Sequence, residues 1–195
     1  VLTSGFAAEK GDQLALADDT QTRTWAEFDE RVNRQIHSLR DAGVEAGDTI
    51  TVLSGNCNEW FETAFACANA GIVVVPVNWH LVASEIAYIL GDSDSKAVIV
   101  GHHFVNEMFK ALDDERCSAI ELALVIGAPS DGRFQNFDDF LAAGSPEEPE
   151  NQSFGGPMFY TSGTTGHPKG VRGSLTNMPE GADPTIWQLI GAGFA

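Results

Sequence analysis

The chain has 195 residues, of which 43% are hydrophobic and 20% charged, so its composition is that of a globular domain and not of a disordered segment. Its 28 acidic residues against 11 basic ones give a formal net charge of −17, which argues against a nucleic-acid or anionic-membrane surface, because both ligands require a basic face. The three cysteines, Cys57, Cys67 and Cys117, are widely spaced, which argues against a disulfide framework or a zinc site and fits a reducing, cytoplasmic compartment.

The first predicted element is an amphipathic helix. Thr24 and Glu27 have the spacing of a capping box, in which each side chain bonds the backbone N–H of the other residue. Apolar residues then recur at three- and four-residue steps and therefore share one face: Trp25, Phe28, Val32, Ile36 and Leu39. Gly43 is expected to end this helix, because glycine adopts the left-handed conformation that closes many helices.

The chain then alternates apolar runs with helical patterns. Strands are predicted at Thr49–Leu53, Ile72–Val77, Ala97–Val100, Leu122–Ile126 and Pro157–Thr161. Helices are predicted at Trp60–Ala70, Ser84–Leu90, Val105–Leu112 and Phe137–Ala143, with glycines 71, 91 and 144 just beyond three of them. This order predicts an α/β fold, layered, with a mostly parallel sheet flanked by helices. The longest apolar run, Ile72–Val77, is far too short to span a membrane.

The predicted organisation has three parts. Strand and helix units occupy residues 1–144, and residues 145–156, which contain two prolines and three glutamates, are expected to form a loop or linker. Residues 157–175 are expected to form a strand followed by a ligand-binding loop.

Residues 161–170 read TSGTTGHPKG, a pattern suited to phosphate. Glycines 163, 166 and 170 allow sharp turns and close backbone approach, while the hydroxyls, the backbone N–H groups and Lys169 supply donors. The alternatives are an ordinary solvated Gly/Thr loop and a P-loop kinase or ATPase. The P-loop reading fails because Lys169 precedes a glycine and not a serine or threonine.

The ordered string Thr161–Gly170 resembles the signature loop of the adenylate-forming (AMP-binding) superfamily, which includes acyl-CoA synthetases, luciferases and the adenylation domains of peptide synthetases. The segment that starts TWAEFDERVN and continues to residue 100 also resembles the N-terminal region of that family. The resemblance implies that the loop binds the β- and γ-phosphates of ATP through Thr161, Ser162, Gly163, Thr164, Thr165, Gly166 and Lys169. It also implies that Thr164 contacts Mg²⁺ through the nucleotide.

The resemblance implies a two-step reaction. A carboxylic acid is joined to AMP from ATP with release of pyrophosphate, and a thiol such as that of coenzyme A then displaces AMP from the acyl-adenylate. The stretch VNWHLVASEIAYIL resembles acyl-CoA synthetases more than peptide-synthetase domains, so the expected substrate is a carboxylic acid, fatty or related. The alternatives are a non-catalytic remnant that binds a nucleotide or a partner protein, and a peptide synthetase-like adenylation domain.

Members of the family are more than twice this length, so residues 1–195 are expected to be an incomplete N-terminal part of an acyl-CoA synthetase-like large domain. The later Tyr-Gly…Thr-Glu segment, the ribose-binding aspartate and the late adenylation lysine have no counterpart here, and no lysine follows Lys169. We therefore expect this chain alone to be inactive, with no catalytic residue of its own. Apolar surface exposed by truncation is expected to favour self-association.

Overall fold

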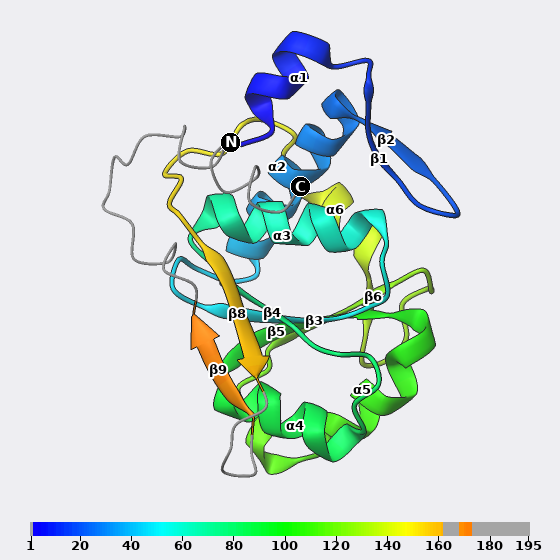
Figure 1. Ribbon diagram of the computed structural model, residues 1–195, viewed down its shortest axis with the longest axis vertical. Coiled ribbons are helices and arrows are strands. Elements are labelled where there is room, and N and C mark those ends of the chain that lie inside the picture. Colours follow the sequence, from blue (N-terminus) through cyan, green and yellow to red (C-terminus); the bar gives the residue numbers. More distant parts are fainter. Residues whose placement is uncertain (1, 162–167, 173–195) are drawn as a thin grey trace.

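The computed structural model describes residues 2–161 and 168–172, which form an α/β fold with a central sheet between two layers of helices (Figure 1). In chain order the helices and strands are α1 Ser4–Lys10, β1 Leu14–Ala17, β2 Thr22–Thr24, α2 Trp25–Asp41, β3 Thr49–Leu53, α3 Asn58–Ala70, β4 Val73–Pro76, α4 Ala83–Asp92, β5 Ser95–Gly101, α5 Val105–Ala111, β6 Leu122–Ile126, β7 Gln135–Asn136, α6 Phe137–Ala143, β8 Gly156–Thr161 and β9 Lys169–Arg172. Short 3₁₀ turns lie at His102–Phe104 and Glu115–Cys117. None of the described helices is long and apolar enough to cross a membrane.

The main sheet of the described residues has seven strands in the order β7-β6-β5-β3-β4-β8-β9. All neighbouring strands are parallel except β8 and β9, which pair antiparallel, and β1 and β2 form a separate hairpin. The predicted α/β fold with a mostly parallel sheet is confirmed. Parallel neighbours place the carboxyl ends of β6, β5, β3, β4 and β8 at one edge of the sheet, where α/β folds bind ligands.

Helices cover both faces of the sheet (Figure 1). Helices α2, α3 and α6 pack on one face around a core that includes Phe28, Ile36 and Phe137, and α4 and α5 pack on the other around Ile86 and Met108. Each core contains buried β-branched residues of the central strands, as expected for parallel strands covered on both sides. The sheet is therefore a rigid support for the loops at its carboxyl edge.

Helix α2 forms as its sequence predicts. The Thr24 hydroxyl accepts a hydrogen bond from the backbone N–H of Glu27, and the Glu27 carboxylate accepts one from the backbone N–H of Thr24. Its predicted apolar face is buried at Phe28, Val32, Ile36 and Leu39. The match follows because capping and periodicity are local signals that tertiary contacts here reinforce.

Gly91 does not end its helix as predicted. Helix α4 continues to Asp92, and a Cβ at Gly91 would lie 2.8 Å from the Cβ of Arg116 and 3.1 Å from its carbonyl oxygen. The glycine therefore allows the close approach of the turn at Arg116, and it does not stop the helix. Gly71, in contrast, has φ of +74° and does end α3.

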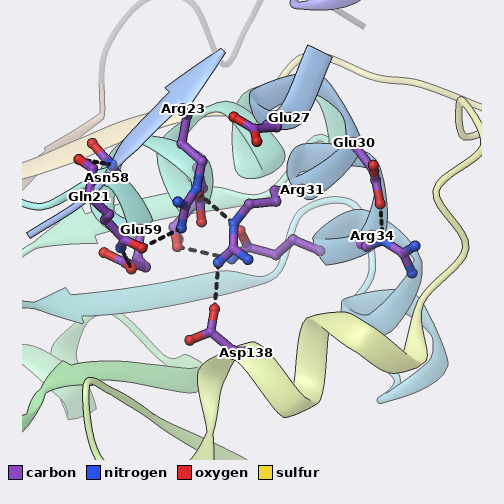
Figure 2. Close-up of polar contacts among 12 residues, drawn as sticks. Gln21, Arg23, Glu27, Glu30, Arg31, Arg34, Asn58, Glu59 and Asp138 are labelled. Carbon is purple, nitrogen blue, oxygen red and sulfur yellow. Dashed lines mark hydrogen bonds and ion pairs between the residues drawn. The ribbon is translucent and has the colours of Figure 1, made fainter. Parts of the chain in front are cut away.

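A buried ion-pair network joins α2 and α3 to the β1–β2 hairpin and α6 (Figure 2). The fully buried Glu62 of α3 accepts from Arg31 Nε at 2.6 Å and from Arg23 Nε at 3.1 Å. Arg31 also donates to Asp138 at 2.7 Å. Nearby, Gln21 donates to Glu59. One carboxylate thus connects segments far apart in the sequence.

Candidate functional site

The candidate site lies where β8 ends and β9 begins, at the carboxyl edge of the sheet (Figure 1). Strand β8 runs parallel to β4, with Val73 beside Gly156 and Val74 beside Pro157. Strand β9 returns antiparallel, so that Thr161 pairs with Lys169. A hydroxyl and an ammonium group from opposite ends of the signature motif are thereby brought to neighbouring positions.

The structure places Thr161 and Lys169 of the predicted phosphate-binding residues. The other five, Ser162, Gly163, Thr164, Thr165 and Gly166, lie outside the described residues. Thr161 and Lys169 are both exposed, so their donors are open to a ligand. The role of Thr164 toward Mg²⁺ also stays a prediction.

Side chains alternate across the β8–β9 ribbon. Tyr160 and Gly170 pair on one face, and Phe159 pairs with Val171 on the other, the face that Thr161 and Lys169 share. Phe159 is 50% exposed and Val171 is 53% exposed. The open face of the ribbon therefore combines an apolar pair with the polar groups of the site.

Gly170 allows the two strands to pack tightly on the inner face of the ribbon. A Cβ there would lie 3.0 Å from Met158 Sδ and 3.2 Å from Tyr160 Cζ. Both contacts are closer than side chains normally make. The last glycine of the motif therefore packs closely against Met158 and Tyr160, and a larger residue there would have to displace these side chains.

Lys169 and Arg172, both on β9, have neither an acidic nor a backbone-carbonyl partner within the described part of the chain. The remaining basic residues each contact an acid, a backbone carbonyl or an aromatic ring: Lys10, Arg23, Arg31, Arg34, Arg40, Lys96, Lys110, Arg116 and Arg133. In a chain of net charge −17, a basic side chain without an acidic partner is unexpected, because acidic residues outnumber basic ones. The position of Lys169 and Arg172 beside the motif favours an anionic ligand at this end of the ribbon.

Helix α4 supports the ribbon through groups that sequence reasoning missed. The Tyr160 hydroxyl donates to Asp92 at 2.7 Å, and the Tyr88 hydroxyl donates to the carbonyl oxygen of Pro168 at 3.1 Å. Tyr88 also makes a longer, 3.5 Å contact with Asp92. Burial, and then the hydrogen bond to Asp92, raise the pKa of Tyr160 well above its usual range, so this hydroxyl remains a donor at neutral pH.

Two surface hollows, of about 300 and 310 Å³, lie away from the motif. One lies at β6 and β7, around Arg133, and the other is lined by Asp18, Cys57 and Phe61. Burial would raise the pKa of Asp18, but hydrogen bonds from Thr20, Asn58 and Gln21 lower it to about 2. That fixed negative charge disfavours a phosphate in the second hollow. In the first hollow Arg133 is already paired with Asp113, and Glu121 and Asp131 add negative charge to the lining.

Comparisons with known proteins identify the family of the chain. The family model described as "AMP-binding enzyme" matches residues 4–188. The chain is 31% identical over 190 residues to 3-oxocholest-4-en-26-oate–CoA ligase of Rhodococcus rhodochrous. This alignment covers 94% of the chain and 32% of the relative. It is 32% identical over 171 residues to the fatty acid–[acyl-carrier-protein] ligase ScoC of Streptomyces coeruleorubidus. This alignment covers 87% of the chain and 31% of the relative. The chain thus spans about a third of the length of these curated relatives.

Solved structures show the same fold. The anthranilate CoA ligase AuaEII in complex with anthranoyl-AMP superposes with a TM-score of 0.82 at 23% identity, over 90% of this chain and 34% of that one. A fatty acyl CoA synthetase of Mycobacterium tuberculosis superposes with a TM-score of 0.73 at 25% identity, over 88% of this chain and 33% of that one. With the family model matching nearly its whole length, the chain belongs to the family of AMP-binding enzymes.

Proposed function

We propose that this chain supplies the ATP-phosphate-binding part of an AMP-forming acid–thiol ligase. The observation that carries the proposal is the strand pairing of Thr161 with Lys169 at the carboxyl end of a parallel strand, where Lys169 has no acidic partner among the described residues. Here Thr161, Ser162, Gly163, Thr164, Thr165, Gly166 and Lys169 bind the β- and γ-phosphates, and Thr164 contacts Mg²⁺ held by the nucleotide. The domain division proposed for this task is residues 1–144, 145–156 and 157–175.

The chemistry explains why phosphate positioning matters. A carboxylate resists attack by a thiol because its leaving group would be oxide, whereas an acyl-adenylate releases AMP. The loop holds the β- and γ-phosphates while the carboxylate attacks the α-phosphorus, so pyrophosphate leaves from a fixed position. The ammonium of Lys169 stabilises negative charge on the departing group. It is not the late adenylation lysine of the family.

The substrate class is a carboxylic acid, fatty or related, and the acyl acceptor is the thiol of coenzyme A. The relatives named for fatty acids and for 3-oxocholest-4-en-26-oate support an apolar acid. The relative named for an acyl-carrier protein keeps a carrier-bound thiol as the alternative acceptor, as in a peptide synthetase-like domain. We propose a cytoplasmic location, which the three free cysteines support.

Titration of the chain with ATP, pyrophosphate and AMP by calorimetry tests this proposal. ATP and pyrophosphate are expected to bind at least about tenfold more tightly than AMP, because AMP lacks the phosphates that the loop recognises.

We also propose that the chain alone shows no ATP–pyrophosphate exchange, since it has no counterpart of the late lysine. Equal affinity for AMP and ATP would contradict phosphate recognition, and measurable exchange would contradict the inactivity. Binding without exchange in a longer reading frame would favour the non-catalytic alternative.

Self-association through the open face of the β8–β9 ribbon is a further part of the proposal. The exposed pair of Phe159 and Val171 supports it, because apolar cross-strand pairs gain free energy when covered. The mean mass measured by light scattering is expected to rise with protein concentration, and a Phe159→Thr/Val171→Thr variant is expected to stay nearer to monomer mass. Val82→Thr changes an equally exposed valine elsewhere and should leave association unchanged. A wild-type chain that stays monomeric at high concentration would refute this part.

A further inference from the structure

The structure assigns a positioning role to Tyr88, Asp92 and Tyr160, which we propose act as a clamp that fixes the two ends of the phosphate-binding motif relative to helix α4. The inference rests on the proposed function, because it concerns the placement of Thr161 and Lys169. None of the three clamp residues contacts the phosphates in this proposal. They act through the backbone next to the residues that do.

The clamp holds the chain at both ends of the motif. Tyr160 immediately precedes Thr161, and Pro168 immediately precedes Lys169. The Asp92 carboxylate accepts a hydrogen bond from the Tyr160 hydroxyl at 2.7 Å. Tyr88, one helical turn earlier on α4, donates a hydrogen bond to the Pro168 carbonyl oxygen at 3.1 Å. One face of a single helix therefore holds the chain directly before each of the two described phosphate-facing residues.

Strand β9 needs such support. Within the described part of the chain it pairs with β8 alone, and all four of its residues are exposed. A two-stranded ribbon has little stability of its own. Helix α4, in contrast, buries Ile86, Ala87 and Leu90 against the sheet. The clamp couples the ribbon to that rigid element, which reduces the conformational freedom that Lys169 would lose on binding a phosphate.

Removal of Asp92 should change phosphate affinity in opposite directions for a purely electrostatic role and for a positioning role. Asp92 is a carboxylate close to a loop proposed to bind an anion, so electrostatics alone predict that its removal strengthens phosphate binding. A positioning role predicts the opposite. In the structure the Asp92 carboxylate accepts from the Tyr160 hydroxyl, and replacement by alanine would release that end of the motif.

The test is calorimetric titration of the 195-residue chain with pyrophosphate. Tyr88→Phe and Asp92→Ala are each expected to raise Kd by about 3- to 10-fold, the range for loss of one neutral hydrogen bond, because both residues act on the ligand only through the backbone. Asp41→Ala, which removes the same charge from an exposed site on α2, is expected to leave Kd unchanged. In a Lys169→Ala background, Tyr88→Phe is expected to have no further effect, whereas a loss of general stability would weaken binding in both backgrounds.

Amide hydrogen exchange provides a readout that needs no ligand. Tyr88→Phe is expected to speed exchange of residues 169–172 and to leave β3 unchanged, because the Tyr88 hydroxyl bonds the carbonyl oxygen of Pro168, directly before β9. An Asp92→Ala chain that binds pyrophosphate as tightly as wild type, or unchanged exchange in β9, would overturn the clamp. A wild-type chain that does not bind pyrophosphate would instead overturn the proposed function, and the exchange measurement would still decide the clamp.

Discussion

Replacement of Glu62 by alanine is expected to lower the free energy of unfolding by about 3 kcal/mol, at the lower end of the range for removing one partner of a buried ion pair. The Glu62 side chain is fully buried and accepts from Arg31 and Arg23, so its loss leaves two guanidinium groups without their shared carboxylate. The lower end applies because Arg31 keeps Asp138 and both arginines reach solvent. Chemical denaturation of wild type and variant measures the difference.

Asp138→Ala is the matched control. It removes an exposed partner of the same Arg31, with a side chain 59% accessible, and is expected to cost less than about 1 kcal/mol. If both variants cost the same, burial of Glu62 would not be the source of its effect.

The pH dependence of this effect has a definite sign. Burial raises the pKa of the Glu62 carboxyl above 4.5, against the lowering effect of Arg31 and Arg23, and the Oε2 atom has no hydrogen-bond partner among the described residues. A raised folded-state pKa means that the folded chain holds this proton more tightly than the unfolded chain does. Wild type should therefore lose stability relative to Glu62→Gln as pH rises from about 4.5 through the raised pKa.

Local sequence signals predicted most of the main sheet and its helices. Strands β3 and β6 and helix α6 begin and end where their apolar patterns and flanking residues predict. These elements lie in the centre of the fold or against it, where burial agrees with local preference. The phosphate-binding role of the motif at 161–170 stays a prediction, which rests on residue types that carry phosphate chemistry in themselves.

Elements defined by pairing were missed. Strand β7 has only two residues and exists through its register with β6, and the β1–β2 hairpin is held against α2 with no alternating pattern in its sequence. The sequence predicts a loop where strand β9 forms, because Lys169–Arg172 has little strand character until it pairs with β8. Tertiary contacts decide such short strands.

The hydrogen bonds between helix α4 and the motif could not be predicted from the sequence either. Tyr160 and Asp92 are 68 residues apart, and Tyr88 and Pro168 are 80 apart. In the sequence, Tyr88 lies within the helix predicted at Ser84–Leu90 and Asp92 lies just beyond it, and no motif marks either residue as part of a site. Only the topology, in which α4 lies beside the end of β8 (Figure 1), brings them to the motif.

The second large effect is expected at Lys169. Replacement by alanine should weaken pyrophosphate binding by about 10- to 100-fold, the equivalent of one charge-assisted hydrogen bond of about 1.5–3 kcal/mol. Lys169 is exposed, stands opposite Thr161, and has no acid paired with it in the described ranges, so its charge is available to a ligand. Truncation of an exposed side chain should leave the unfolding free energy within about 0.5 kcal/mol of wild type.

Calorimetric titration of pyrophosphate into wild type, Lys169→Ala and Lys110→Ala tests whether phosphate binds at Thr161 and Lys169. Lys110 is an exposed lysine on α5 that pairs with Glu107, so its removal changes the net charge equally at a distant site. Lys169→Ala is expected to lose at least about tenfold in affinity, whereas Lys110→Ala is expected to change by less than about twofold, because salt screens distant charges. Equal losses in the two variants, or wild-type affinity in Lys169→Ala, would contradict a phosphate site at Thr161 and Lys169.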